Sequence, residues 1–302
     1  MADATVIARP KSRGASRIFT GIGTLWREAN WVQRLAMVLA LVLAAAALFA
    51  PLVAPFGPVE QSLIARLRPP IGFENYREGY LLGTDELGRD VLSRSLYGLR
   101  LTLSLALLGA IIGLLLGGIL GVLAGLMGGV FEDFVMGTVD AQIAIPFTLI
   151  ALLILAIFGS SLTIMVLVLG LHGWEQYARI VRGEVRKLVE MPFIEAARAA
   201  GATDRRIATR HILPNITSPL VVQFTLSFSN IVLLESTLSF LGLGVQPPTA
   251  TLGAMVGIGR DYMPTAPWIV VAPALMILLV TFAVQILGDW LRDRADVRLR
   301  AR

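Results

Sequence analysis

The segment Pro192–Pro214, with the sequence PFIEAARAAGATDRRIATRHILP, decides how this chain is organised, because it is a charged island between hydrophobic spans. Pro192 suits the first turn of a short helix, and Gly201 suits the left-handed residue that ends it. Thr203 can cap a second short helix, which Pro214 is expected to end. This charged segment therefore predicts two short helices joined by a tight turn.

The side chains between Glu195 and Gly201 are mostly methyl groups, so another protein could approach the backbone of the charged segment closely. Glu195 lies near the positive end of the first helix dipole. Arginines at the edges could fix the orientation of a partner, and these are Arg198, Arg205, Arg206 and Arg210. The pattern predicts a docking surface rather than a catalytic site.

Two other interpretations of the charged segment are open. Ala197 and Gly201, four residues apart between two short helices, also fit the turn of a helix-turn-helix DNA reader. The spans on both sides would hold its recognition helix near the bilayer, so nucleic acid is not the expected partner. The other interpretation is an ordinary cytoplasmic loop that carries an excess of positive charge.

The composition indicates a membrane protein. Of the 302 residues, 56% are hydrophobic and 16% are charged, and the mean hydropathy is +0.74, whereas soluble domains carry about 25% charged residues. No cysteine is present, which excludes disulfides and thiolate metal sites. Hydrophobic runs predict an all-α polytopic membrane protein with six transmembrane helices. The expected spans are residues 31–54, 99–126, 138–158, 162–181, 216–241 and 267–288.

The distribution of positive charge predicts the orientation in the membrane. Six spans place both termini on one side. Nineteen of the 26 lysines and arginines fall in the N-terminal tail through Arg34, in the segment Arg179–Arg210 and in the C-terminal tail, and seven fall in the other loops. Because positive loops stay inside, both termini and the charged segment are expected in the cytoplasm.

The second span carries glycines at an unbroken spacing of four, and these are Gly109, Gly113, Gly117, Gly121 and Gly125. Residues at this spacing share one helix face, and glycine lets a neighbouring helix approach backbone to backbone. We therefore expect a tight packing face along this span.

The charged segment resembles the cytoplasmic coupling motif of permease subunits in binding-protein-dependent ABC importers. The resemblance rests on Glu-Ala-Ala at residues 195–197, on Gly201 and on Leu-Pro at residues 213–214. The sequence departs from the general pattern at His211, where that pattern has isoleucine. The resemblance implies contact with an ATPase subunit through Glu195, Ala196, Ala197, Arg198, Ala200, Gly201, Asp204, Leu213 and Pro214.

Two more stretches resemble the dipeptide/oligopeptide branch of these permeases: Leu82–Asp90, LGTDELGRD, and Leu238–Pro248, LSFLGLGVQPP. The resemblance implies a type I ABC importer permease fold in a bacterial plasma (inner) membrane. The implied partners are a homologous second permease, two ATPase subunits, an extracytoplasmic substrate-binding protein, membrane lipid and a peptide substrate. ATP and Mg²⁺ would be bound by the ATPase subunits, so no cofactor or metal is expected in this chain.

These expectations divide the chain into five parts. They are a cytoplasmic N-terminal tail (1–30), a first transmembrane anchor (31–54), an extracytoplasmic segment with an interfacial helix that Thr84 caps (55–98), a permease transmembrane domain (99–288) that includes coupling helices at 192–213, and a cytoplasmic C-terminal tail (289–302).

Known catalytic motifs are missing from the sequence. His172 and His211 cannot form an HExxH zinc site, and no G-x-S-x-G is present. Neither lysine fits a phosphate-binding loop, so energy for pumped transport would have to arrive through a partner. A channel or secondary transporter without ATP is the alternative, with Glu235 and Asp140 as its candidate ion or proton sites. An intramembrane enzyme is disfavoured because no nucleophile or metal constellation is recognisable.

Polar residues within spans are costly and indicate a pathway. A polar stripe on the fifth span is expected to line the translocation cavity, with plain interhelical hydrogen bonding as the alternative, and its residues are Gln223, Ser227, Asn230 and Thr237. Glu235 is expected to bind a substrate amine or, preferably, to lie near the outer interface and brace Arg260. Trp174 is expected to anchor the fourth span at the membrane interface.

The sequence does not identify the substrate. The branch that the chain resembles is associated with dipeptides, longer peptides and nickel complexes, and selectivity would lie largely in the binding protein. The lack of a histidine cluster argues against a metal site within this chain, although a chelated metal remains possible as cargo. A di- or oligopeptide is the expected substrate, with nickel or another small solute as the alternative.

Overall fold

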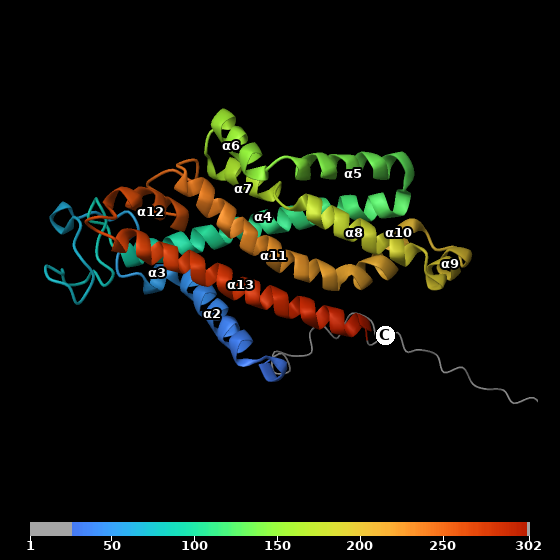
Figure 1. Ribbon diagram of the computed structural model, residues 1–302, viewed down its shortest axis with the longest axis horizontal. Coiled ribbons are helices and arrows are strands. Elements are labelled where there is room, and N and C mark those ends of the chain that lie inside the picture. Colours follow the sequence, from blue (N-terminus) through green and yellow to red (C-terminus); the bar gives the residue numbers. More distant parts are fainter. Residues whose placement is uncertain (1–25, 301–302) are drawn as a thin grey trace, which may run out of the picture.

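The computed structural model describes residues 26–300, with side chains described through Arg294 (Figure 1). Most of the predicted N-terminal tail therefore lies outside the described residues. Within them the chain is helical, as predicted, and the β pairing there is a single isolated bridge between Thr84 and Asp90. The α-helices are α2 (Trp31–Leu48), α3 (Ala50–Val53), α4 (Val91–Met127), α5 (Gly129–Ala144), α6 (Phe147–Phe158), α7 (Leu162–Gly170), α8 (Trp174–Val189), α9 (Pro192–Ala199), α10 (Asp204–Ile207), α11 (Leu213–Phe240), α12 (Leu252–Gly259) and α13 (Trp268–Arg300).

Among residues 26–300, four helices are long and apolar enough to cross a membrane: α2, α4, the run Asp204–Phe240 that contains α11, and α13. A fifth candidate is the pair α5 and α6, which bends by 88° near Pro146, a residue that has no backbone N–H to continue the helix. The predicted span 162–181 is divided at Gly173, whose φ is 86°, and neither α7 nor α8 passes as a span by itself. The described residues therefore do not confirm the count of six.

The long helix α4 packs along α7 and α8, and its five regularly spaced glycines are all buried in this contact. A Cβ atom on Gly109 would lie 2.9 Å from the Cβ of Leu169, and one on Gly125 would lie 2.7 Å from the Cβ of Val185. Residue numbers rise together on both sides of this contact, from Gly109 against Leu169 to Gly125 against Val185, so α4 runs parallel to α7 and α8. Backbone-to-backbone packing of this kind requires glycine.

The remaining long helices complete a bundle around α4. In Figure 1, α11 and α13 lie beside α4, and α2 lies against α13. Buried apolar side chains from α2, α4, α7 and α11 form the largest core cluster. The last helix continues from Trp268 to Arg300, so the predicted C-terminal tail is the end of a long helix rather than a separate segment.

The segment before α4 differs from the prediction of an interfacial helix capped by Thr84. The helix begins at Val91, and Asp90 caps it by accepting a hydrogen bond from the backbone N–H of Ser93 at 2.8 Å. Residues 83–90 instead form a turn, because Asp85 accepts hydrogen bonds from the backbone N–H groups of residues 87 and 89. A turn residue that bonds its own backbone competes with helix formation.

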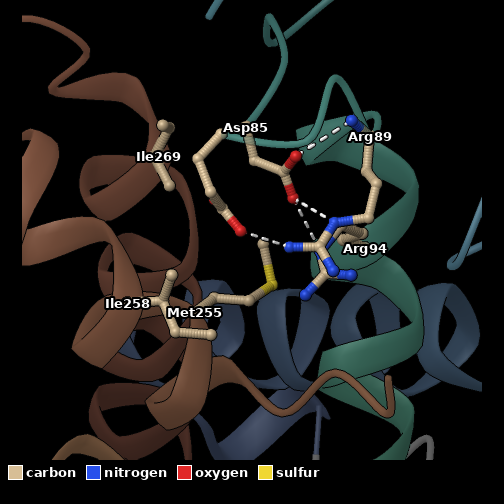
Figure 2. Close-up of a pocket in the computed structure, with 7 residues that line it drawn as sticks. Asp85, Arg89, Arg94, Met255, Ile258 and Ile269 are labelled. Carbon is tan, nitrogen blue, oxygen red and sulfur yellow. Dashed lines mark hydrogen bonds and ion pairs between the residues drawn. The ribbon is translucent and has the colours of Figure 1, made fainter. Parts of the chain in front are cut away.

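This turn is held by a buried ion cluster, which Figure 2 shows beside α12 and α13. The Nε atom of Arg89 lies 2.6 Å from a carboxylate oxygen of Asp85, and the Nε atom of Arg94 lies 3.3 Å from the same oxygen. Met255 of α12 and Ile269 of α13 line the apolar side of the cluster. The cluster joins the turn to the first residues of α4, so this end of the molecule is a folded cap rather than a loose loop.

Candidate functional site

The first helix of the charged segment forms as the sequence predicts. Pro192 begins α9, Glu195 lies in its first turn, and Gly201 has a left-handed φ of 80°. Beyond the helix end, the N–H of residue 202 donates to the carbonyl of Ala197 at 3.0 Å, and the N–H of Gly201 donates to the carbonyl of Arg198 at 2.9 Å. These two bonds are the Schellman motif, which fixes the direction in which the chain leaves a helix.

The second helix of the charged segment differs from the prediction at its end. Thr203 caps α10, as predicted, by accepting a hydrogen bond from the N–H of Arg206 at 3.4 Å. Pro214 does not end this helix, because a π-helical turn over Ala208–Ile212 joins α10 directly to α11. Pro214 lies in the first turn of α11, where a missing N–H leaves no hydrogen bond unmade. The charged segment is therefore continuous with α11.

The charged segment has an exposed outer surface and a buried apolar surface that packs against α8. Ile194, Ile207 and Ile212 are fully buried and pack in one cluster with Val181 and Val185 of α8. Eight of the nine residues expected to contact an ATPase are exposed, and Ala197 is half-buried; the exposed ones are Glu195, Ala196, Arg198, Ala200, Gly201, Asp204, Leu213 and Pro214. A displacement of the exposed surface would therefore be transmitted to α8 through closely packed side chains.

An ion cluster near the same end of the bundle joins α5 to α8. Glu132 is buried, and one of its oxygens accepts a hydrogen bond from the Nε of Arg182 at 2.5 Å. The other oxygen pairs with Arg186. Sequence reasoning missed this cluster, although the adjacent carboxylates Glu132 and Asp133 at the start of an otherwise apolar helix signal the need for a partner.

A polar network joins α5 to the first turn of α8. The Nε1 of Trp174 donates to the side-chain oxygen of Gln142 at 2.7 Å, and the side-chain nitrogen of Gln142 donates to Glu175 at 3.0 Å. Trp174 is 6% exposed. The prediction that Trp174 anchors the span at the membrane interface is therefore wrong, because the ring is buried between two helices.

The predicted polar stripe on α11 divides between two environments. Gln223 is buried and donates to the side-chain oxygen of Gln176 on α8 at 2.7 Å and to the hydroxyl of Ser227 at 3.1 Å. Asn230 and Thr237 are exposed instead. For the two buried members, the contacts are the interhelical and local hydrogen bonds that the sequence allowed as the alternative. The stripe is not one continuous lining.

Glu235 is fully buried, is hydrogen-bonded to two hydroxyl groups, and does not brace Arg260. Its side chain is 0% exposed and accepts hydrogen bonds from the hydroxyls of Thr102 at 3.0 Å and Ser239 at 2.7 Å. Thr102 also accepts the N–H of Leu252, at the start of α12. Arg260 instead lies over the ring of Phe240 and beside Asp261. The preferred bracing role was wrong, and Glu235 joins α11 to α4 and α12.

Replacing Glu235 with glutamine is expected to leave assembly and transport within twofold of the unaltered chain, whereas leucine is expected to lower the thermal midpoint by several degrees. The glutamine amide still reaches both hydroxyls, but leucine leaves the Thr102 and Ser239 hydroxyls buried without their partner. The check is the unfolding midpoint of the purified chain together with solute uptake. If glutamine were as damaging as leucine, the negative charge rather than the hydrogen bonding would be essential.

Comparison with known proteins gives one family and several relatives. Residues 117–297 match the family described as binding-protein-dependent transport system inner membrane component. The chain is 41% identical over 260 residues to the di/tripeptide transport system permease protein DppC of Pseudomonas aeruginosa (strain UCBPP-PA14), an alignment that covers 86% of each chain. It is 45% identical over 254 residues to the dipeptide transport system permease protein DppC of Escherichia coli (strain K12), covering 84% of this chain and 85% of the relative.

A solved structure described as inward facing conformations of the MetNI methionine ABC transporter is also similar. The likeness has a TM-score of 0.49 and 25% sequence identity, and it covers 66% of this chain and 94% of the solved one.

Proposed function

Because this chain belongs to the family of binding-protein-dependent transport system inner membrane components, we propose that it forms half of the translocation pathway of an ATP-driven importer for di- or oligopeptides. Relatives that align with most of the chain carry the names of dipeptide and di/tripeptide permeases. By this proposal the chain works with a homologous second permease, two ATPase subunits and an extracytoplasmic substrate-binding protein.

The observation that carries the coupling role is the construction of the charged segment. Its outer surface is exposed, and its underside is held by Ile194, Ile207 and Ile212 against α8 and α11. An ATPase subunit that binds this surface would move α9 and α10 as a rigid lever, since Ile194 of α9 and Ile207 of α10 both pack into the apolar cluster with α8. The movement of α8 and α11 would then open the pathway alternately to each side of the membrane.

We propose six crossings, with α7 and α8 together forming one broken crossing. The chain from Leu162 to Val189 is about 40 Å long at about 1.5 Å per residue, which is enough to pass a hydrocarbon core of about 30 Å. Because α7 and α8 run parallel to α4, they would cross the membrane in the same direction as α4. Both termini and the charged segment would then lie in the cytoplasm, consistent with the bias of positive charge.

The energy source in this proposal is the partner ATPase pair. The sequence has no phosphate-binding loop of its own, so ATP and Mg²⁺ would bind to the partner subunits. This chain would contribute positioning and movement, with no covalent chemistry.

The experiment is a pull-down of the tagged chain from its native membrane in mild detergent, followed by mass spectrometry and by dipeptide uptake in vesicles made from the recovered complex. We expect an ATPase subunit and a second permease to be recovered, and to be lost when Glu195 and Gly201 are both replaced. Glu190→Ala changes an exposed glutamate just before α9 and should leave recovery unchanged. Recovery of the chain alone, with solute movement in vesicles free of ATP, would overturn the proposal in favour of a channel or secondary transporter.

A further inference from the structure

One face of α11 is left uncovered by the other helices of residues 26–294. Hydrogen bonds join α11 to α8 and to α4 on one side, and glycines of α12 and α13 pack against it on another (Figure 1). The remaining side carries four exposed residues at helical spacing, and these are Asn230, Leu233, Thr237 and Phe240. These four residues are here called the open face of α11.

Asn230 lies halfway between two contacts that mark the ends of apolar stretches on neighbouring helices. Five residues earlier, Thr225 packs against Gly288, where the uncharged part of α13 ends. Five residues later, Glu235 accepts a hydrogen bond from Thr102, the second residue of the uncharged run 101–131 on α4. At about 1.5 Å per residue, Asn230 is about 7.5 Å along the helix from either level. Its amide is therefore inside the apolar layer rather than at its edge.

The two polar residues of the open face differ in their hydrogen bonding. The hydroxyl of Thr237 donates to the backbone carbonyl of Leu233 at 2.8 Å, so it is satisfied within its own helix. The side chain of Asn230 is exposed and has no hydrogen-bond partner among residues 26–294. An asparagine amide offers two donor hydrogens and one acceptor oxygen, and leaving them unpaired in hydrocarbon is costly. Asn230 therefore needs a partner from outside the described bundle.

The composition of the open face favours protein as its cover over lipid or water. Lipid would leave the Asn230 amide without hydrogen bonds. A water-filled passage would satisfy the amide but would also wet Leu233 and Phe240, which are 41% and 37% exposed. A helix of another subunit can cover the apolar side chains and hydrogen-bond the amide at the same time. A single polar residue within an apolar contact also fixes the register of two helices.

We propose that the open face of α11 is a contact surface for the second permease, and that the Asn230 amide hydrogen-bonds to a polar side chain or a free backbone carbonyl on a helix of that subunit. The inference rests on the proposed function, which supplies the second permease. Because α11 continues directly from the charged segment, one helix would meet an ATPase subunit at its inner end and the second permease within the membrane. Movement of the charged segment would then reach the interface between the permeases along α11.

The first test locates the partner by photocrosslinking in native membranes. The photoreactive residue p-benzoylphenylalanine is placed at Leu233 or at Phe240, so that Asn230 itself is kept. We expect both positions to form a crosslink to the second permease, identified by mass spectrometry. The control is the same residue at Phe228, on the opposite side of α11 and packed against the core, which should not reach the second permease. Crosslinks to lipid alone from the open face, in a complex that contains the second permease, would overturn the proposal.

A thiol-labelling experiment distinguishes a protein contact from a water-filled passage. The chain has no cysteine, so Leu233→Cys provides a single thiol on the open face. We expect a membrane-impermeant maleimide to label it at least tenfold more slowly than Leu63→Cys, a position that is 73% exposed in the segment before α4. Equal labelling of the two thiols in the assembled complex would show that water covers this face and would overturn the proposal.

A third test measures what the Asn230 amide contributes to the contact. Asn230→Leu is expected to lower the fraction of complex that keeps its second permease in rising dodecyl sulfate by about threefold or more. The amount of chain in the membrane should not change, since the amide bonds nothing within the described bundle. Thr237→Val is the matched control on the same face, because it removes a hydroxyl that bonds only its own helix, and it should leave retention unchanged.

The outcomes of this test separate the contact from the proposed function. Unchanged retention in Asn230→Leu, or an equal loss in Thr237→Val, would overturn the role of the amide while the second permease is still recovered with the unaltered chain. If the unaltered chain recovered no second permease at all, the proposed function would fail, and this inference would fail with it.

Discussion

Replacing Gly117 with leucine is expected to prevent stable packing of α4 against α8 and to remove the chain from the assembled complex. A Cβ atom at this position would lie 2.1 Å from the carbonyl oxygen of Trp174 and 2.7 Å from the Cβ of Tyr177. The nearest atom belongs to the backbone at the start of α8, so no side-chain rotation relieves the clash. Overpacking typically destabilises by about 1–3 kcal/mol and occasionally by more, and we expect the upper end of this range. The measurements are the amount of chain in the membrane and the thermal midpoint of the complex.

Gly118→Leu provides the matched control. It is the next residue of the same helix, and a Cβ atom there would have no other atom within 4 Å. The helix propensity of the two substitutions is the same, so a difference between them reports packing alone. Normal assembly of the Gly117→Leu variant would contradict the glycine face, and so would equal damage from both variants.

Replacing Gly201 with valine is expected to lower import about tenfold or more without removing the chain from the membrane. The φ of 80° is the left-handed conformation, and no atom lies within 4 Å of the position that a Cβ would take. The effect is therefore one of backbone strain, about 1–2 kcal/mol for an L-residue and more for a branched one. A free-energy change of about 1.4 kcal/mol alters an equilibrium constant tenfold. The equilibrium here is between chains in which the turn at Gly201 has its observed conformation and chains in which it does not.

The control for this prediction is Gly201→Asn, because asparagine tolerates the left-handed conformation better than other non-glycine residues. Import by the asparagine variant should lie between that of valine and that of glycine. Import and ATPase binding are measured together in reconstituted vesicles. If the Gly201→Val variant imports as fast as the unaltered chain, the turn does not transmit movement, and the proposal that α9 and α10 act as a rigid lever is wrong.

Several features of the fold follow from local sequence alone. The glycine spacing of four on α4 predicted a packing face, and those glycines lie buried against α7 and α8. Pro192 and Gly201 predicted the start and the end of the first short helix, and Thr203 predicted the start of the second; all three are confirmed. Such signals are readable because each depends on a single residue's backbone freedom or on a hydrogen bond within one turn.

Other features depended on which helices became neighbours. Glu235 is buried because two hydroxyl groups donate hydrogen bonds to it there. One belongs to Thr102 of α4, about 130 residues earlier in the chain, and the other to Ser239, one turn later on the same helix. The polar residues of α11 follow one helical spacing, yet α8 covers Gln223 and leaves Asn230 exposed. The sequence also placed the start of a helix at Thr84, but the Asp85 carboxylate binds its own backbone and the arginines, and the helix starts seven residues later.

The sequence by itself determined that this chain is helical and membrane-spanning, that one helix packs through glycine, and that a charged segment between spans carries two capped short helices. Each of these depends on composition, periodicity or a conformational preference within a few residues. The tertiary structure alone decided the surroundings of the polar and charged side chains: Glu235 is buried against hydroxyl groups, Trp174 is buried between helices, and Asp140 and Arg179 are exposed. A polar group's role is set by the partner it meets, and for most of these groups that partner lies on another helix, far away in the chain.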